Sequence, residues 1–132
     1  MNREKIFIIA GEDSGDLHGA KLIESLNKKN PSAEFFGIGG NRMQSAGLIL
    51  IEHIKNLNVI GIFEVIKHYP RIKKIFNKTI EEIKKIHPHK VILIDYPGFN
   101  LRLAKELKAL NFNITYFILP LSLIHISEPT RQ

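Results

Sequence analysis

The feature that most constrains this chain is an unbroken apolar run, Val91 to Ile94, that ends directly on a carboxylate, Asp95. Such a run, rich in β-branched residues, is typical of a strand buried on both faces of a parallel sheet. Because ligands of open α/β sheets bind beyond the carboxyl ends of the strands, Asp95 is a candidate catalytic residue. Pro97-Gly98 follows at once and predicts a turn, so the alternative is that Asp95 only caps that turn.

A second acidic loop, Gly11–Asp16, follows an apolar run near the N-terminus. Its carboxylates would repel a phosphate, and it lacks both the Walker pattern and the dinucleotide-binding glycine pattern. We therefore interpret it as a loop that binds sugar hydroxyls, with glycines that let substrate approach the backbone. The candidate residues are Glu12, Ser14, Gly15 and Asp16. The alternative for Ser14 or Asp16 alone is a helix N-cap.

The pattern along the chain predicts a single α/β fold, a Rossmann-like parallel sheet with flanking helices. Apolar runs predict strands over residues 5–10, 34–38, 48–51, 91–95 and 114–119. Helical periodicity predicts helices over 17–28 and 101–110, a short one containing Met43 and Ala46, and two pieces between 59 and 86. We expect the break between these two pieces at Pro70, since proline disfavours helix in the residue before it.

A glycine-rich stretch, Gly37–Met43, follows the second predicted strand. Gly39 and Gly40 would permit close approach of a substrate to the backbone. Arg42 is placed to meet an anion near a helix start. This turn is therefore a second candidate for substrate binding, although glycine-rich strand-to-helix turns are common.

Composition narrows the classes of function. The chain of 132 residues is 44% hydrophobic and 24% charged, as expected of a globular domain, and it has no cysteine. Its histidines are scattered, so we expect neither a metal site nor a cofactor. No apolar stretch is long enough to span a bilayer, and no signal segment is evident, so we expect a cytoplasmic protein.

The net charge of +6 is concentrated between Lys67 and Lys90. Such a block favours an anionic partner or is simply a solvated helix face. The preceding segment, 59–69, is apolar and turns basic at its end, so it is either buried core or a helix on an anionic membrane surface. The candidate membrane contacts are Ile62, Phe63, Val65, Ile66 and Tyr69. Aromatic residues are few, and we expect no nucleic-acid partner.

Four ordered motifs resemble those of the lipid-A-disaccharide synthase family. They are Ala10-Gly11-Glu12-x-Ser14-Gly15-Asp16, Gly37-x-Gly39-Gly40-x-Arg42-Met43, Gly61-x-x-Glu64-Val65 and Ile94-Asp95-x-Pro97-x-Phe99-Asn100. The resemblance implies a two-domain GT-B glycosyltransferase, of which residues 1–120 would be the N-terminal, acceptor-side domain. We expect residues 121–132 to be a non-native read-through tail.

The resemblance also implies a reaction and roles for residues. UDP-2,3-diacylglucosamine would be joined to 2,3-diacylglucosamine 1-phosphate by an enzyme peripheral on the inner membrane. Asp95 would be the general base, Asn100 would support its loop, and Glu12, Ser14 and Asp16 would line the sugar pocket. Gly98 replaces a common Asp of the family, so a second carboxylate is absent from that loop.

Two other classes of function stay open on the sequence. One is another GT-B enzyme, such as a peptidoglycan glycosyltransferase or a UDP-sugar epimerase, which would share the fold but use a different first loop. The other is a non-catalytic basic module that binds anionic membrane or nucleic acid through residues 67–90.

Overall fold

The computed structural model describes residues 3–57 and 61–118, and for residues 61–68 it describes the backbone only. The predicted tail, 121–132, lies outside the described residues. The strands form one sheet in the order β3-β2-β1-β4-β5, and every neighbouring pair is parallel. They are β1 (Lys5–Ala10), β2 (Glu34–Gly39), β3 (Leu48–His53), β4 (Lys90–Ile94) and β5 (Ile114–Phe117). The predicted α/β class and the Rossmann-like parallel sheet are confirmed.

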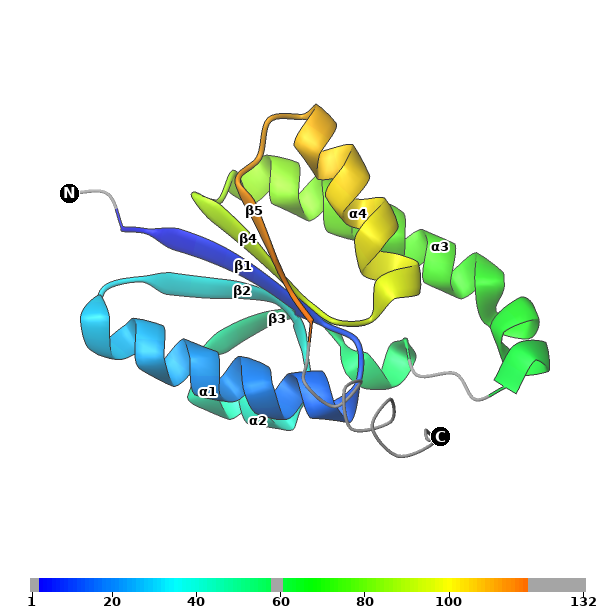
Figure 1. The fold of residues 1–132 in the computed structure, drawn as a ribbon, viewed down its shortest axis with the longest axis horizontal. Coiled ribbons are helices and arrows are strands. Elements are labelled where there is room, and N and C mark those ends of the chain that lie inside the picture. Colours follow the sequence, from blue (N-terminus) through cyan, green and yellow to red (C-terminus); the bar gives the residue numbers. More distant parts are fainter. Residues whose placement is uncertain (1–2, 58–60, 119–132) are drawn as a thin grey trace, which may run out of the picture.

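Helices cover both faces of the sheet (Figure 1). They are α1 (Asp13–Lys29), α2 (Asn41–Ala46), α3 (Gly61–Ile86) and α4 (Pro97–Ala109), with a short 3-10 helix, η1 (Ile54–Asn56). In Figure 1, α1 and α2 lie on one side of the strands, and α3 and α4 on the other. Among the described residues, no helix is both long enough and apolar enough to cross a bilayer.

The central strand β1 supplies a hydrophobic core on each face. Ile6, Ile8 and Ala10 pack with the residues of α1 and α2, such as Ile23 and Met43. Phe7 and Ile9 pack on the opposite side with residues of α3 and α4, such as Ile83 and Leu103. This alternation is the period-two geometry of a strand, and it explains why the run is apolar at every position.

Two expectations about helices are wrong. Pro97 and Gly98 do not form a turn, because Pro97 occupies the first turn of α4, where its fixed φ suits a helix and its missing N–H is not needed. Pro70 does not divide α3. A proline inside a helix costs about 3 kcal/mol, and the buried residues that follow, Ile75, Ile80 and Ile83, offset this cost by packing on the sheet.

The strand register decides where the loops lie. Ala10, the last residue of β1, pairs with Ile94, the last residue of β4. Ile9 and Ile38, each the next-to-last residue of its strand, pair between β1 and β2. The segments that leave these three strands therefore begin together at the carboxyl edge of the sheet, as predicted for the two acidic loops.

Candidate active site at the carboxyl edge of the sheet

Asp95 and Tyr96 alone connect β4 to α4, and both have left-handed backbone angles. Their φ values are 44° and 52°, in a region that residues other than glycine seldom adopt. Such a conformation costs about 1–3 kcal/mol per residue and persists only where the surroundings impose it. This strained connection is the most unusual backbone feature of the edge.

Hydrogen bonds hold the backbone of Asp95 on both sides. Its N–H donates to the carbonyl oxygen of Phe117 at 2.8 Å. Its carbonyl oxygen accepts from Asn100 Nδ2 at 2.8 Å and from the Tyr116 hydroxyl at 3.0 Å. The Asp95 side chain is half-buried, and no hydrogen bond joins its carboxylate to another described residue. The backbone is thus fixed while the carboxylate is left for other contacts.

Asn100 is fully buried one turn into α4, and its amide supports the Asp95 connection. Its Nδ2 also donates to the carbonyl oxygen of Ile94 at 3.3 Å. Because both partners are acceptors, the nitrogen of the amide must face them. Asn100 therefore fixes the backbone of this connection, and its part in the reaction stays a prediction.

Burial and the carboxylates at this edge raise the pKa values of two neighbouring tyrosines. Burial raises the pKa of Tyr116, and the negative charge of Asp95 adds to the rise. Burial likewise raises the pKa of Tyr96, with an added contribution from the charge of Glu12. Glu12 and Asp95 therefore act electrostatically on neighbouring phenols, which stay protonated and able to donate at neutral pH.

Asp16 is buried, with 5% of its surface exposed, and it caps α2 rather than α1. Its Oδ1 accepts from the N–H groups of Gly40 at 2.7 Å and Met43 at 3.0 Å, and its Oδ2 accepts from that of Arg42 at 3.1 Å. The start of α2 is therefore occupied by a carboxylate of the same chain. The backbone N–H groups of this helix start therefore have an acceptor within the chain, whereas the Arg42 side chain is exposed, and its contact with an anion stays a prediction.

The predicted substrate-binding glycines are buried beside other side chains of the chain. A Cβ at Gly40 would lie 2.6 Å from Asp16 Oδ2, and one at Gly39 would lie 2.6 Å from the sulfur of Met43. A Cβ at Gly15 would lie 3.0 Å from the Cβ of Ala10. Internal packing accounts for glycine at these three positions without a ligand.

A polar cavity of about 320 Å³ lies at the ends of β2 and β3. The exposed Arg42 and Asn41 line it together with Asp13 and His53. His53 Nδ1 accepts from the N–H of Lys55 at 3.1 Å, so Nε2 carries the proton and donates to Asn41 Oδ1 at 2.9 Å. Carboxylate, amide and guanidinium groups of this kind can bind hydroxyls.

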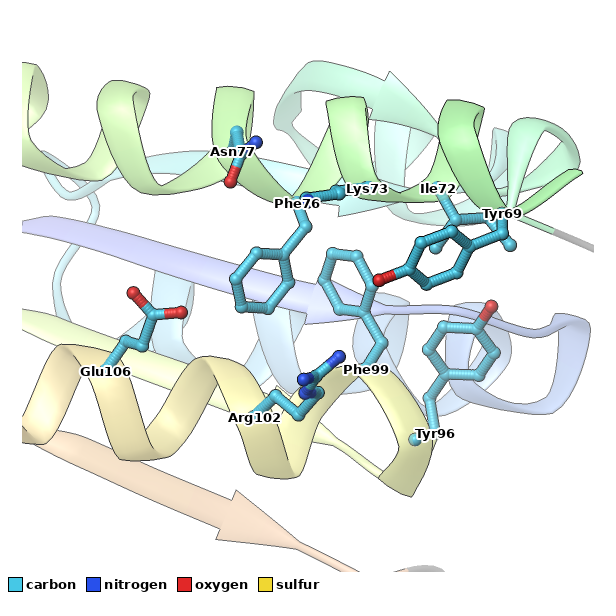
Figure 2. Close-up of a pocket in the computed structure, with 10 residues that line it drawn as sticks. Tyr69, Ile72, Lys73, Phe76, Asn77, Tyr96, Phe99, Arg102 and Glu106 are labelled. Carbon is cyan, nitrogen blue, oxygen red and sulfur yellow. The ribbon is translucent and has the colours of Figure 1, made fainter.

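A larger groove of about 510 Å³ separates α3 from α4 (Figure 2). Its aromatic floor includes Phe76 and Phe99, whose ring centroids lie 5.3 Å apart, edge to face. Arg102 extends into it, Lys73 and Tyr69 line it, and Tyr69 is 50% exposed. Of the predicted membrane contacts, only the side chain of Tyr69 is described. The side chains of the others, Ile62, Phe63, Val65 and Ile66, lie outside the described part.

The remaining predicted residues keep accessible positions. Glu12 precedes the first turn of α1 and is exposed, and Ser14 is partly exposed within that turn. Among the described side chains, those of residues 3–57 and 69–118, no three of His, Asp or Glu are grouped so that they could hold a metal ion. The sequence reasoning missed Tyr96 and Tyr116, although Tyr96 occupies the variable position inside the Asp95 motif.

Comparison with known proteins gives one consistent family. A family model described as lipid-A-disaccharide synthetase matches residues 6–123. Lipid-A-disaccharide synthase of Myxococcus xanthus is 41% identical over 120 residues, which are 91% of this chain and 31% of the relative. The enzymes of Koribacter versatilis and Coxiella burnetii are 42% and 37% identical, over 88% and 91% of this chain and 31% and 32% of their own lengths. The chain thus spans about a third of these relatives.

Proposed function

The chain belongs to the lipid-A-disaccharide synthetase family, and we propose that the full-length protein joins two acylated glucosamine units. The donor is UDP-2,3-diacylglucosamine, and the acceptor is 2,3-diacylglucosamine 1-phosphate. The products are the β-1,6-linked disaccharide 1-phosphate and UDP. This chain forms the acceptor-side, N-terminal domain of a GT-B fold. The observation that carries the proposal is Asp95, held at the carboxyl end of β4 by bonds to its backbone alone.

In the proposed reaction, Asp95 acts as the general base. Its carboxylate takes the proton from the acceptor 6-hydroxyl while that oxygen bonds to the anomeric carbon of the donor. The bond from this carbon to the UDP oxygen breaks, and UDP leaves with the electron pair. A base placed in this way contributes about 10²–10⁴-fold to a rate. The donor side of the cleft belongs to the remainder of the protein.

Glu12, Ser14 and Arg42 are proposed to bind the sugar of the acceptor. Glu12 and Ser14 lie at the start of α1, beside the Asp95 connection, and Arg42 lines the polar cavity at the end of β2. The role of Asp16 in this arrangement is to fix the start of α2, and with it the position of Arg42.

The test of this function uses the purified full-length protein with both acylated substrates. We expect UDP release to match the appearance of the disaccharide by mass spectrometry, and omission of either substrate to abolish both. The 132-residue chain alone is expected to yield neither, because it spans only about a third of the length of its relatives. UDP release by the full-length protein with an unacylated donor, but not with the acylated donor, would favour another GT-B enzyme.

We also propose that α3 rests on the anionic face of the inner membrane, on the cytoplasmic side. Arg71, Lys73 and Lys74 are exposed on it, next to the half-exposed Tyr69. Basic residues near an anionic leaflet contribute about 1 kcal/mol each to binding. A peripheral position would give the enzyme access to substrates whose acyl chains stay in the bilayer.

Replacing Ile62, Phe63 and Ile66 together with serine should lower recovery with anionic vesicles and leave the melting temperature close to that of the parent. If these residues were core, each change would cost about 2–5 kcal/mol, and the melting temperature would collapse. Ile49→Ser is the matched control, because Ile49 is a 53% exposed apolar residue that belongs to β3 and not to α3. Vesicle flotation and thermal melting of the full-length protein provide the two readouts.

A further inference from the structure

We propose that Tyr96 and Gly11 act together to position Asp95, an inference that rests on the proposed role of Asp95 as the base. The ring of Tyr96 lies directly on Gly11. A Cβ at Gly11 would stand 2.3 Å from Cδ2 and Cγ of that ring, far inside van der Waals contact. Only glycine leaves room for the ring there.

The hydroxyl of Tyr96 fixes the other end of the ring. It donates to the carbonyl oxygen of Leu57 at 2.8 Å, and Leu57 is fully buried just after η1. Figure 2 shows the ring at the start of α4, beside Phe99, with a centroid separation of 5.9 Å. One side chain thereby joins the segments that follow β1, β3 and β4.

These contacts explain how a tyrosine stays in a left-handed conformation. Nothing intrinsic to tyrosine favours φ near 52°, so the ring contacts must offset the backbone cost. Asn100 and Tyr116 hold the carbonyl of Asp95, and the contacts of the Tyr96 ring hold the backbone of the next residue, Tyr96 itself. The direction of the Asp95 carboxylate depends both on the bonds to its carbonyl oxygen and on the contacts of the Tyr96 ring. If the ring leaves Gly11, the connection can relax toward ordinary angles and the carboxylate turns away.

The experiment compares Gly11→Ala, Tyr96→Ala and the double variant in the full-length protein. Each single change should lower kcat by about ten- to a hundredfold, because small misplacements of a catalytic group cost this much. Binding of the donor should change little. In the double variant, Gly11→Ala should add almost nothing, since the ring that it displaces is gone. Tyr96→Phe keeps the ring and should recover most of the rate.

Gly98→Ala is the matched control. Gly98 lies in the first turn of α4, and a Cβ there would meet no atom within 4 Å. Its kcat should stay within about twofold of the parent, as for an exposed substitution that removes no contact. Amide exchange of the peptide that contains Asp95 gives a readout independent of activity. It should accelerate in Tyr96→Ala and not in Gly98→Ala.

Repeating Tyr96→Ala in the Asp95→Asn variant distinguishes an effect on the position of Asp95 from a general loss of structure. If Tyr96 acts through Asp95, Tyr96→Ala should slow the parent and add little to Asp95→Asn. The inference would be overturned if Tyr96→Ala lowered kcat by the same factor in the parent and in Asp95→Asn. It would also be overturned if Gly11→Ala lowered kcat by the same factor with and without the Tyr96 ring. A normal rate for Asp95→Asn would instead remove the proposed base. If Gly11→Ala does not fold, the Tyr96→Ala and Tyr96→Phe pair in these two backgrounds decides the matter.

Discussion

Asp95→Asn in the full-length protein is expected to slow turnover by about 10²–10⁴-fold, the usual contribution of a general base. The fold should persist, because every described hydrogen bond of Asp95 uses its backbone and survives the change. Asparagine also tolerates left-handed backbone angles better than most residues, so the connection to α4 gains no strain. The measurements are kcat at saturating acceptor and the melting temperature.

Glu24→Gln is the control for a lost negative charge. Glu24 is exposed on α1 and does not line the polar cavity that contains Arg42. It should alter turnover far less than Asp95→Asn, since an exposed charge is screened. Turnover near that of the parent for Asp95→Asn would exclude Asp95 from proton transfer, whatever the role of the rest of the edge.

The sheet could be predicted from the sequence because its signal is local. The limits of β1 agree with the prediction, Lys5–Ala10, and the apolar runs of β2 and β4 are equally clear. A strand buried on both faces needs apolar residues at every position, so neither the register nor the neighbours had to be known first.

Helix starts were harder to predict because their residues also suit turns. α1 begins at Asp13 rather than Leu17, and α4 begins at Pro97 rather than Leu101. Acidic side chains are favourable in the first turn of a helix, and proline is favourable at its first position. These preferences do not distinguish a loop before a helix from the first turn of that helix.

Only those contacts of the site that join residues close together in the sequence could be predicted. Asp95 and Asn100 belong to one motif, and their contact was anticipated. The contact of Tyr96 with Gly11 and that of Tyr116 with Asp95 join distant segments. No spacing pattern reports such contacts, so the sequence did not point to either tyrosine.

Asp16→Ala is expected to destabilise the protein by about 2–4 kcal/mol. It would leave the N–H groups of Gly40, Arg42 and Met43 without their acceptor, and a buried donor without a partner costs about 1–3 kcal/mol. Water that enters the space left by the side chain would accept some of these hydrogen bonds and so lower the free-energy cost. The free energy of unfolding of the full-length protein, from denaturant titration, measures the effect.

Two further variants separate capping from substrate binding at Asp16. Asp16→Asn keeps an oxygen for Gly40 and Met43 but turns an amide toward the N–H of Arg42, so it should lose an intermediate amount of stability. Asp13→Ala removes an acid from the same helical turn but leaves the hydrogen bonds of Asp16 to α2 in place, and should cost less than about 1 kcal/mol. A stable Asp16→Ala variant with lost turnover would show that Asp16 binds substrate and that the cap of α2 is dispensable.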